Sequence, residues 1–457
     1  MTERPVPMKT LPAELRRIAV LAWPVVLGQL GLMMMGIVDT LMVGRHGAVA
    51  VAGLGLGHAW TFAAAIVGIG AAMGLDPMLT QAHGARDNAA YDRAVAHGVG
   101  LLGWLCIPIG ALHLVCGPVM VALGEPAEVI GLAHDYSVIL TLSVPPLLAF
   151  SLLRQGLQAR ELMKPAMWVI LGANVANIAI NAVLLFGVGD WPGLGPVGVA
   201  WATTSVRWLM FLALLPWCLR ELRAVARAWR EAFNVRALVR VAGVALPVGV
   251  QTGLEVWAFG LGTVIVGWFG AVAVAAHQVT LNLTALSFMV PTGIGSAAAT
   301  RVGNLVGAGQ PWQRPGWVAV GLGASVMTMS AVVYATQAAP LAKLFLPDDP
   351  AAVAMVALLL PIGAVFQVFD GTQVVAFGVL RGLGDTRVPA LANIVGYYAL
   401  GLPAGAALAL YGGLGPAGVW VGLTIALSSV ALILLGRLWV LARRGLPGQV
   451  AGVEVAS

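Results

Sequence analysis

Three acidic residues lie inside long apolar segments, where a charge is costly. Asp39, Glu255 and Asp370 have apolar neighbours on both sides, whereas most of the 19 acidic residues fall in loops. A charged side chain at the centre of a bilayer costs about 2.5–3.5 kcal/mol on the mildest scale, so such an acid is a candidate functional group. The structural alternative is a carboxyl group held in a hydrogen bond between two helices.

Two of these acids lie in the second half of the chain. Asp370 is eleven residues from Arg381, about 16 Å along a helix, which predicts a position near the middle of a span. Glu255 is fifteen residues from Arg240, about 22 Å, and lies further out. If the two carboxyl groups are close, they could take up a proton or supply oxygen ligands to a small hard cation.

A second set of polar groups is expected at similar depth in the first half. Asp39 precedes the turn at Gly44 by five residues. Asn177 and Asn181 are four residues apart and share one face of a helix, and Thr203 stands early in the next apolar segment. Together these groups could bind a coupling cation or a proton. The alternative is that they hydrogen-bond helices to one another, as polar residues in membrane bundles do.

A basic residue also lies within an apolar segment of the first half. Arg207 follows Thr203 by one helical turn. It could neutralise an acid of this half, or it could extend along the helix to the lipid interface. A fixed positive charge there would weaken the case for a metal ion nearby.

Candidate substrate contacts lie in the second half of the chain, within one apolar segment. Gln278 and Asn282 are four residues apart, and Phe288 lies further along the same apolar segment. The two amides could hydrogen-bond a substrate, and the ring could stack on an organic cation. Helix packing is the alternative role for all three residues.

The chain that carries these groups is dominated by apolar segments. Of its 457 residues, 60% are hydrophobic and 10% are charged, against about 25% charged in soluble domains. A spanning helix needs about 20 mostly apolar residues. The sequence therefore predicts an all-α membrane protein with twelve transmembrane helices, centred near residues 30, 62, 105, 144, 177, 207, 253, 286, 325, 367, 400 and 428.

The basic residues orient these helices. With a cytoplasmic N-terminus, 22 of the 25 basic residues fall in cytoplasmic segments, and the exceptions are Arg45, Arg207 and Lys343. This bias follows the positive-inside rule and predicts that both termini are cytoplasmic. The net charge of +6 is thereby explained without nucleic acid. The basic segment 220–240 is either a solvated linker or a surface helix on anionic lipid.

The two halves of the sequence repeat. Gly47 to Ala52 recurs as Gly270 to Ala275 at an offset of 223, and the same offset relates Pro24-Val25 to Pro247-Val248 and Gly70 to Gly293. Six spans in each half give both halves the same orientation. We therefore expect two parallel-repeat six-helix lobes, 1–219 and 241–457, joined by a basic cytoplasmic linker, 220–240. Such repeats commonly work by alternating access around a site near the midplane.

Sequence features of other protein classes are missing. The three cysteines, Cys106, Cys116 and Cys218, have no metal-binding spacing. The sequence contains no phosphate-binding loop and no nucleophile motif. The chain is therefore not expected to be an enzyme or to be driven directly by ATP, and no cofactor is expected besides a coupling ion.

Several short motifs, in order and spacing, resemble the multidrug and toxic compound extrusion (MATE) family, NorM type. The motifs are Val38-Asp39-Thr40 before Gly44, Asn177 with Asn181, Leu246-Pro247 before Glu255, Ala275-Ala276-His277-Gln278-Val279, Gly303-Asn304 before Gly307, Phe366-Gln367-Val368-Phe369-Asp370, and Leu380-Arg381-Gly382-Leu383-Gly384-Asp385. The resemblance covers nearly the whole chain.

The resemblance implies export of organic cations and drugs from a bacterium across its inner membrane, driven by Na⁺ or H⁺. Glu255 and Asp370 match the second-lobe acids, with Na⁺ as the candidate metal ion, and Asp39, Asn177 and Asn181 match the first-lobe site. Thr203 is a looser match, and Arg207 has no place in the family pattern. The expected partners are a small-molecule substrate and the bilayer, with no nucleic acid, and the chain is expected to be a monomer. A lipid-linked oligosaccharide flippase of related fold is the alternative, although it should prefer a basic cavity.

Overall fold

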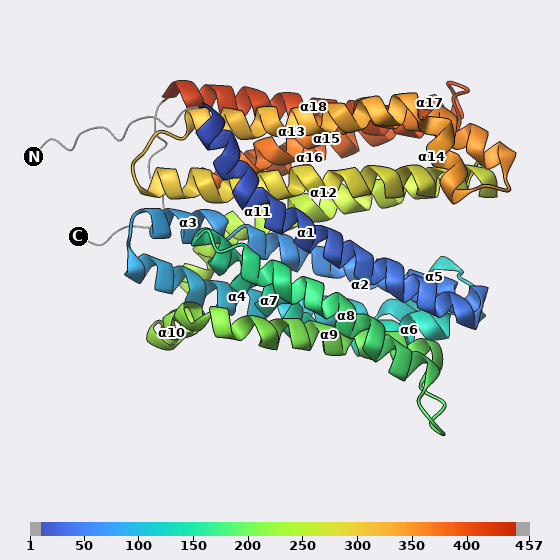
Figure 1. Cartoon of the computed structure of the whole chain (residues 1–457), viewed down its shortest axis with the longest axis horizontal. Coiled ribbons are helices and arrows are strands. Elements are labelled where there is room, and N and C mark those ends of the chain that lie inside the picture. The colour runs from blue at the N-terminus through green and yellow to red at the C-terminus, as the bar shows by residue number, and fades with distance from the viewer. Residues whose placement is uncertain (1–10, 445–457) are drawn as a thin grey trace, which may run out of the picture. The chain divides into compact units, whose positions relative to one another are not determined.

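The computed structural model describes residues 11–444, which form helices joined by short turns (Figure 1). Within that range the β-type pairing is a single isolated bridge between Val188 and Trp191. The helices of the first half are α1 (Leu11–Val43), α2 (Ala48–Met73), α3 (Asp76–Gly84), α4 (Asn88–Leu114), α5 (Cys116–Leu123), α6 (Ala127–Thr141), α7 (Val144–Ala159), α8 (Lys164–Phe186) and α9 (Gly198–Leu214).

A basic connection and a second set of helices follow. The connection contains α10 (Leu219–Arg227) and a 3₁₀ turn, η4 (Trp229–Phe233). The remaining helices are α11 (Val235–Gly267), α12 (Ala271–Gly307), α13 (Gln313–Thr336), α14 (Ala338–Phe345), α15 (Pro350–Gly382), α16 (Arg387–Asn393), the π-helix η5 (Ile394–Gly401), α17 (Leu402–Leu410) and α18 (Pro416–Arg444).

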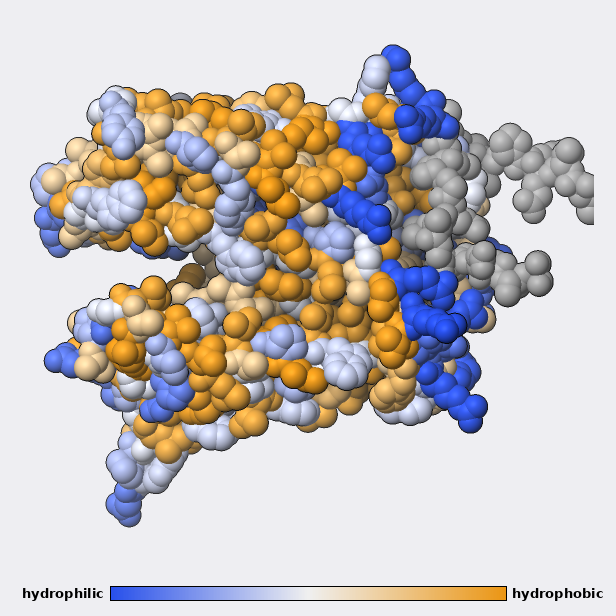
Figure 2. Space-filling model, turned by 180° about the vertical axis from the view of Figure 1, so that it is seen from behind, coloured by the Kyte–Doolittle hydropathy of each residue, from blue (hydrophilic) through white to orange (hydrophobic). Residues whose placement is uncertain are grey.

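The helices confirm the predicted all-α membrane architecture. Within residues 11–444, eleven helical segments are long and apolar enough to cross a membrane. The twelfth predicted span, centred near residue 144, is the pair α6 and α7, which are bent by 53° at the break between them. Apolar residues cover the sides of the helices, and hydrophilic residues gather at their ends (Figure 2).

The sequence repeat is also a repeat of backbone conformation. Gly47 (φ 96°, ψ 172°) precedes α2, and Gly270 (φ 95°, ψ 177°), 223 residues later, precedes α12. Both lie in the positive-φ region that glycine adopts most easily. The helical segments that follow them, Ala48–Gly84 and Ala271–Gly307, are each 37 residues long. Glycines at equivalent positions of the repeat therefore precede the second span of each half.

By its contacts the chain divides into two compact units. Of the described residues, one unit contains 11–26, 261–383 and 395–444, and the other contains 27–260 and 384–394. The division runs through α1 and α11. The lobe boundaries expected from the sequence, 1–219 and 241–457 with the linker 220–240, stay a prediction.

Close glycine contacts explain why the division crosses these two helices. A Cβ atom on Gly70 of α2 would lie 2.8 Å from the Cα atom of Gly249 in α11. A Cβ atom on Gly293 of α12 would collide with Val26 of α1. Gly70 and Gly293 are repeat partners, and small residues permit such close helix packing. The second helix of each half thus contacts the first helix of the other half.

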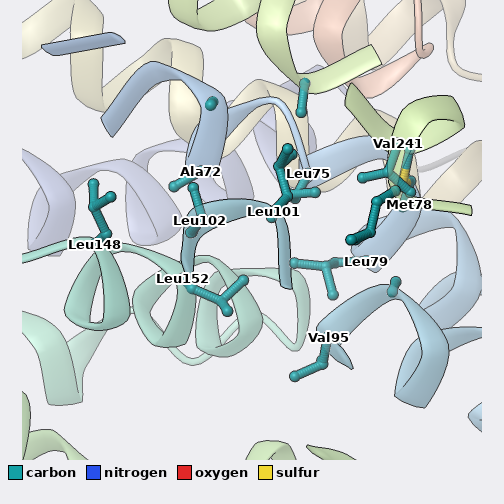
Figure 3. Close-up of a cluster of buried hydrophobic side chains, with 14 of the residues drawn as sticks. Ala72, Leu75, Met78, Leu79, Val95, Leu101, Leu102, Leu148, Leu152 and Val241 are labelled. Carbon is teal, nitrogen blue, oxygen red and sulfur yellow. The ribbon is translucent and has the colours of Figure 1, made fainter. Parts of the chain in front are cut away.

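A buried apolar cluster connects several helices of the unit that contains residues 27–260 (Figure 3). Leu75 lies at the junction of α2 and α3, Leu102 in α4, Leu148 in α7 and Val241 in α11. Interdigitated side chains of this kind resist deformation because interiors are close-packed. The cluster holds α7 and the first part of α11 against α2, α3 and α4.

Candidate functional site

Three helices of one unit bring the predicted first-half site together. Val43 at the end of α1, Leu185 near the end of α8 and Val199 near the start of α9 belong to one buried apolar cluster. Tyr136 of α6 joins the same cluster. This packing places neighbouring positions of α1, α8 and α9 at similar depth, so their polar side chains can meet.

Asp39 is the centre of that polar group. Asn181 Nδ2 donates a hydrogen bond to Asp39 Oδ1 at 2.6 Å, and Asn177 Nδ2 donates to the same oxygen at 3.1 Å. Thr203 Oγ1 donates to Asp39 Oδ2 at 3.3 Å. All four residues predicted for the first-half site are therefore in contact, and three donors stabilise the carboxylate.

The two asparagines also leave acceptors unused. Their side chains are almost fully buried, with 1% of Asn177 and 0% of Asn181 exposed. Their Oδ1 atoms have no hydrogen-bond partner among residues 11–444. A buried acceptor without a partner costs about 1–3 kcal/mol. A carboxylate, a hydroxyl and two free amide oxygens form a donor set that suits a small hard cation, which prefers oxygen ligands.

Arg207 has a specific place beside this group. Its Nη1 atom donates to Ser143 Oγ at 2.7 Å, and Ser143 Oγ donates to the carbonyl of Leu140 at 2.7 Å. The neighbouring Trp208 Nε1 donates to the carbonyl of Leu142 at 3.2 Å. These bonds satisfy backbone groups at the break between α6 and α7, where helical bonding is interrupted. The charge of Arg207 also acts on Asp39.

Asp370 stands in a buried polar row on α15. Only 4% of its surface is exposed, and Gln367 and Gln373, three residues before and after it, are 0% and 1% exposed. Residues three apart lie on one helix face. Neither side-chain polar atom of Gln367 has a hydrogen-bond partner within residues 11–444. The row therefore offers amide groups to a ligand bound near Asp370.

Glu255 is a half-buried residue of α11. It belongs to the unit that contains Asp39, whereas Asp370 belongs to the other unit. The predicted pairing of Glu255 with Asp370 consequently stays a prediction.

The candidate substrate contacts differ in exposure. Gln278 and Asn282 are exposed on one face of α12, and Phe288 is half-buried. His277 beside them is fully buried and bonded within its unit: Trp420 Nε1 donates to His277 Nδ1 at 3.1 Å, and Thr263 Oγ1 lies 3.0 Å from His277 Nε2. Because an indole N–H can only donate, Nδ1 is the acceptor and the proton sits on Nε2. His277 therefore joins α12 to α18 and α11, and the two amides stay candidate substrate contacts.

Sequence reasoning did not assign several residues near these sites. Gln367 and Gln373 share the face of Asp370, and their three-residue spacing was a usable signal. His58 Nδ1 lies 3.3 Å from the hydroxyl of Tyr136, close to Arg207. That contact joins α2 to α6 between residues 78 apart in the sequence. No pattern of neighbouring residues could have predicted it.

Comparison with known proteins fixes the family. The MatE family model matches the chain twice, over residues 24–183 and 247–406. The chain belongs to the MATE family. Both ends of the second match follow those of the first by 223 residues, the offset of the sequence repeat. Because MATE proteins are membrane transporters, the chain is a transporter and not an enzyme.

Bacterial members of the MATE family resemble the chain along nearly its whole length. A probable multidrug resistance protein NorM of Burkholderia pseudomallei (strain K96243) is 36% identical over 440 residues, covering 94% of both chains. A protein of the same name from Deinococcus radiodurans is 35% identical and covers 97% of this chain and 99% of its own. The multidrug resistance protein PmpM of Pseudomonas aeruginosa is 32% identical over 454 residues.

Solved MATE structures share the fold. The eukaryotic MATE transporter AtDTX14 superposes with a TM-score of 0.86 at 22% identity, covering 95% of this chain and 98% of that one. The Vibrio cholerae MATE transporter VcmN in the bent form gives a TM-score of 0.78 at 17% identity, covering 97% and 99%. The predicted membership and fold class are confirmed.

Proposed function

We propose that this MATE transporter is a cation-coupled antiporter that exports amphipathic organic cations or drugs by alternating access. The observation that carries the proposal is the Asp39 group, in which a carboxylate accepts hydrogen bonds from a hydroxyl and two amides inside the membrane-spanning helices, while both amide oxygens are buried without a partner among residues 11–444. The names of the NorM and PmpM relatives support drugs as the cargo.

In this proposal the coupling ion, H⁺ or Na⁺, binds Asp39 together with Asn177, Asn181 and Thr203. A proton on the carboxylate would turn one acceptor oxygen into a donor, so the hydrogen bonds to that oxygen, from α8 at Oδ1 or from α9 at Oδ2, would have to rearrange. A bound Na⁺ would instead be met by the amide oxygens, which would have to turn toward the ion. If α1 is placed differently in the inward-open and outward-open states, the ion binds these two states with different affinity. That difference in affinity would shift the protein from one access state to the other.

Glu255 and Asp370 are the other proposed coupling acids, with Na⁺ as the candidate metal ion. The buried amides beside Asp370 support it, because they add neutral oxygen ligands to a carboxylate. Gln278, Asn282 and Phe288 are the proposed substrate contacts of α12. The orientation with both termini cytoplasmic and the bacterial inner membrane belong to the same proposal, supported by the charge distribution and the bacterial relatives. The monomeric state is also part of it.

The test is drug efflux from proteoliposomes under an imposed Na⁺ gradient and, separately, under an imposed pH gradient. We expect ethidium movement under at least one gradient. We expect Asp39→Asn and the double change Glu255→Gln with Asp370→Asn to slow it at least tenfold. The matched control is Asp190→Asn, which removes a carboxylate from the loop after α8. Unchanged transport in both acid variants would overturn the proposal.

The flippase alternative predicts a basic cavity for a pyrophosphate. Arg207 is the basic residue beside the Asp39 group, and its Nη1 atom is already bonded to Ser143. The surrounding acceptors suit a cation better than an anion, which supports the antiporter.

A further inference from the structure

A basic pocket lies apart from the Asp39 group, and residues of α10 and of the first turns of α4 line it. Figure 1 shows these two helices. Its volume is about 550 Å³. Its lining consists of one side of α10 and the start of α4, namely Asn88, Ala89, Asp92, Arg220, Arg223 and Arg227. Three guanidinium groups face a single carboxylate there, so the pocket carries two unbalanced positive charges.

The three arginines are held differently. Arg227 makes a two-point ion pair with Asp92, with Nε to Oδ2 at 2.7 Å and Nη2 to Oδ1 at 3.1 Å. Arg220 donates to Asn88 Oδ1 at 2.6 Å, and its guanidinium lies 4.5 Å from the centre of the Tyr91 ring. Asn88 and Tyr91 thus orient Arg220 without neutralising its charge. Arg223 has neither a hydrogen bond nor an ion pair within the described range 11–444.

The rest of α10 shows what kind of surface the pocket adjoins. Glu221 and Ala224 are buried against the protein. Leu219 and Leu222 form another face, and Trp229 follows them in η4; these three are 54%, 40% and 52% exposed. The arginine face, at spacings of three and four residues, lies between the buried face and the apolar one. An exposed apolar row beside a basic row is the pattern of a helix that lies in a membrane interface.

We propose that this pocket binds the phosphate headgroup of an anionic phospholipid, while Leu219, Leu222 and Trp229 contact its acyl chains. A guanidinium matches phosphate oxygens in a two-point hydrogen bond. Two unbalanced positive charges suit a phosphodiester and leave no repulsion from Asp92, which Arg227 neutralises. Free phosphate would satisfy the arginines only, whereas a lipid uses the exposed apolar row as well. The site is independent of the coupling ion and of the transported substrate.

The test measures lipid retention by the full-length protein in native mass spectrometry. Phosphatidylglycerol and phosphatidylcholine are added separately to the detergent-purified protein. The pocket variant is Arg220→Gln with Arg223→Gln, and Arg223→Gln alone avoids disturbing the Asn88 contact. The matched control, Arg230→Gln with Arg236→Gln, removes the same charge from exposed positions of η4 and of the start of α11. One arginine near an anionic surface contributes about a fivefold gain in binding.

We expect the double pocket variant to bind phosphatidylglycerol about 25-fold more weakly, the control to bind it as the wild type does, and phosphatidylcholine binding to stay unchanged. Equal loss in pocket and control variants would show a general charge effect and overturn the proposal. So would displacement of the lipid by inorganic phosphate at the concentration of the lipid itself, which would assign the pocket to free phosphate. Retained phosphatidylglycerol binding in Arg223→Gln and in the double variant would also overturn it.

Discussion

Asn181 Nδ2 lies 2.6 Å from Asp39 Oδ1, and this hydrogen bond joins α8 to α1. The Asn181 amide contacts the carboxylate through its N–H donor, so its own oxygen is left buried without a partner among residues 11–444. Asn177 of the same helix donates to the same carboxylate oxygen. Both asparagines therefore link α8 to Asp39.

The first prediction removes that amide. Asn181→Leu keeps the approximate size of the side chain but deletes the donor to Asp39 and the free oxygen. A hydrogen bond to a charged group contributes about 1.5–3 kcal/mol, so the affinity for the coupling cation should fall about tenfold or more. The measurement is the cation concentration that gives half-maximal efflux in proteoliposomes.

Asn174→Leu is the matched control, because Asn174 lies on the same helix and its amide donates to the carbonyls of Gly31 and Ile170. We expect its half-maximal cation concentration to match the wild type. Equal shifts in both variants would mean that helix packing, and not the Asp39 site, is being measured.

The second prediction concerns the break between α6 and α7. Arg207→Met removes the donor to Ser143 Oγ and should destabilise the protein by about 1.5–3 kcal/mol. Ser143→Ala should cost less, about 1 kcal/mol, because one neutral partner is lost. The midpoint of thermal unfolding in detergent reports both.

The double variant distinguishes a direct contact from two separate effects. Residues in contact show coupling of about 0.5–3 kcal/mol, so Arg207→Met with Ser143→Ala should cost less than the sum. Arg314→Met, at an exposed position of α13, should leave the midpoint unchanged. A double variant whose loss of stability equals the sum of the two single losses would contradict the contact between Arg207 and Ser143.

The third prediction is a pH dependence at the connection before α11. His97 Nε2 lies 3.2 Å from Glu231 Oε2, and this hydrogen bond, with a second from Asn234, holds the pKa of Glu231 below its usual value. A lowered pKa in the folded state means that the contact stabilises the protein above the unfolded value, about 4.3, and that this stabilisation is lost as the pH falls through the lowered folded pKa.

Glu231→Gln should therefore lower the unfolding midpoint slightly at pH 7, and its difference from the wild type should shrink toward pH 4 and below. The contact is partly exposed, with 37% of the Glu231 side chain accessible, so its contribution at pH 7 stays below about 1 kcal/mol. A difference that grows as the pH falls would contradict the assignment.

The fourth prediction tests the glycine contacts of the repeat. Gly70→Leu and Gly293→Leu should each destabilise the protein by at least about 1–3 kcal/mol, because the added side chain meets the backbone of α11 or the half-buried Val26 of α1. Gly103→Leu in α4 is the control, since no atom lies within 4 Å of the position of its Cβ. Thermal unfolding should rank Gly103→Leu closest to wild type. A tolerated leucine at Gly70 would refute the close approach of α2 to α11.

Much of this fold could be predicted from the sequence, because hydropathy and charge placement act locally. Span positions followed from runs of apolar residues, and the offset of 223 reappears in Gly47 and Gly270 and in both family matches. The meeting of Asp39 with Asn177, Asn181 and Thr203 was expected from shared depth, helix faces and family resemblance.

Other features depend on tertiary contacts that no local pattern reveals. The average hydropathy does not drop at Leu142 and Ser143, so the break between α6 and α7 could not be predicted from it. The role of Arg207 depends on a serine 64 residues away. The π-helix η5 has ordinary apolar composition, although its glycines Gly396 and Gly401 pack closely on α18.

The exchanged contacts of α1 and α11 have a consequence for how the chain is made. Val26 of α1 meets its glycine partner, Gly293, only after more than half of the chain has been synthesised. The helix α1, which is synthesised first, therefore cannot form its contact with α12 until α12 has been made. Contacts between residues so far apart in the sequence slow folding. Neither half contains all of its own neighbours, so a gene cut between α10 and α11 should yield fragments that are stable only when expressed together.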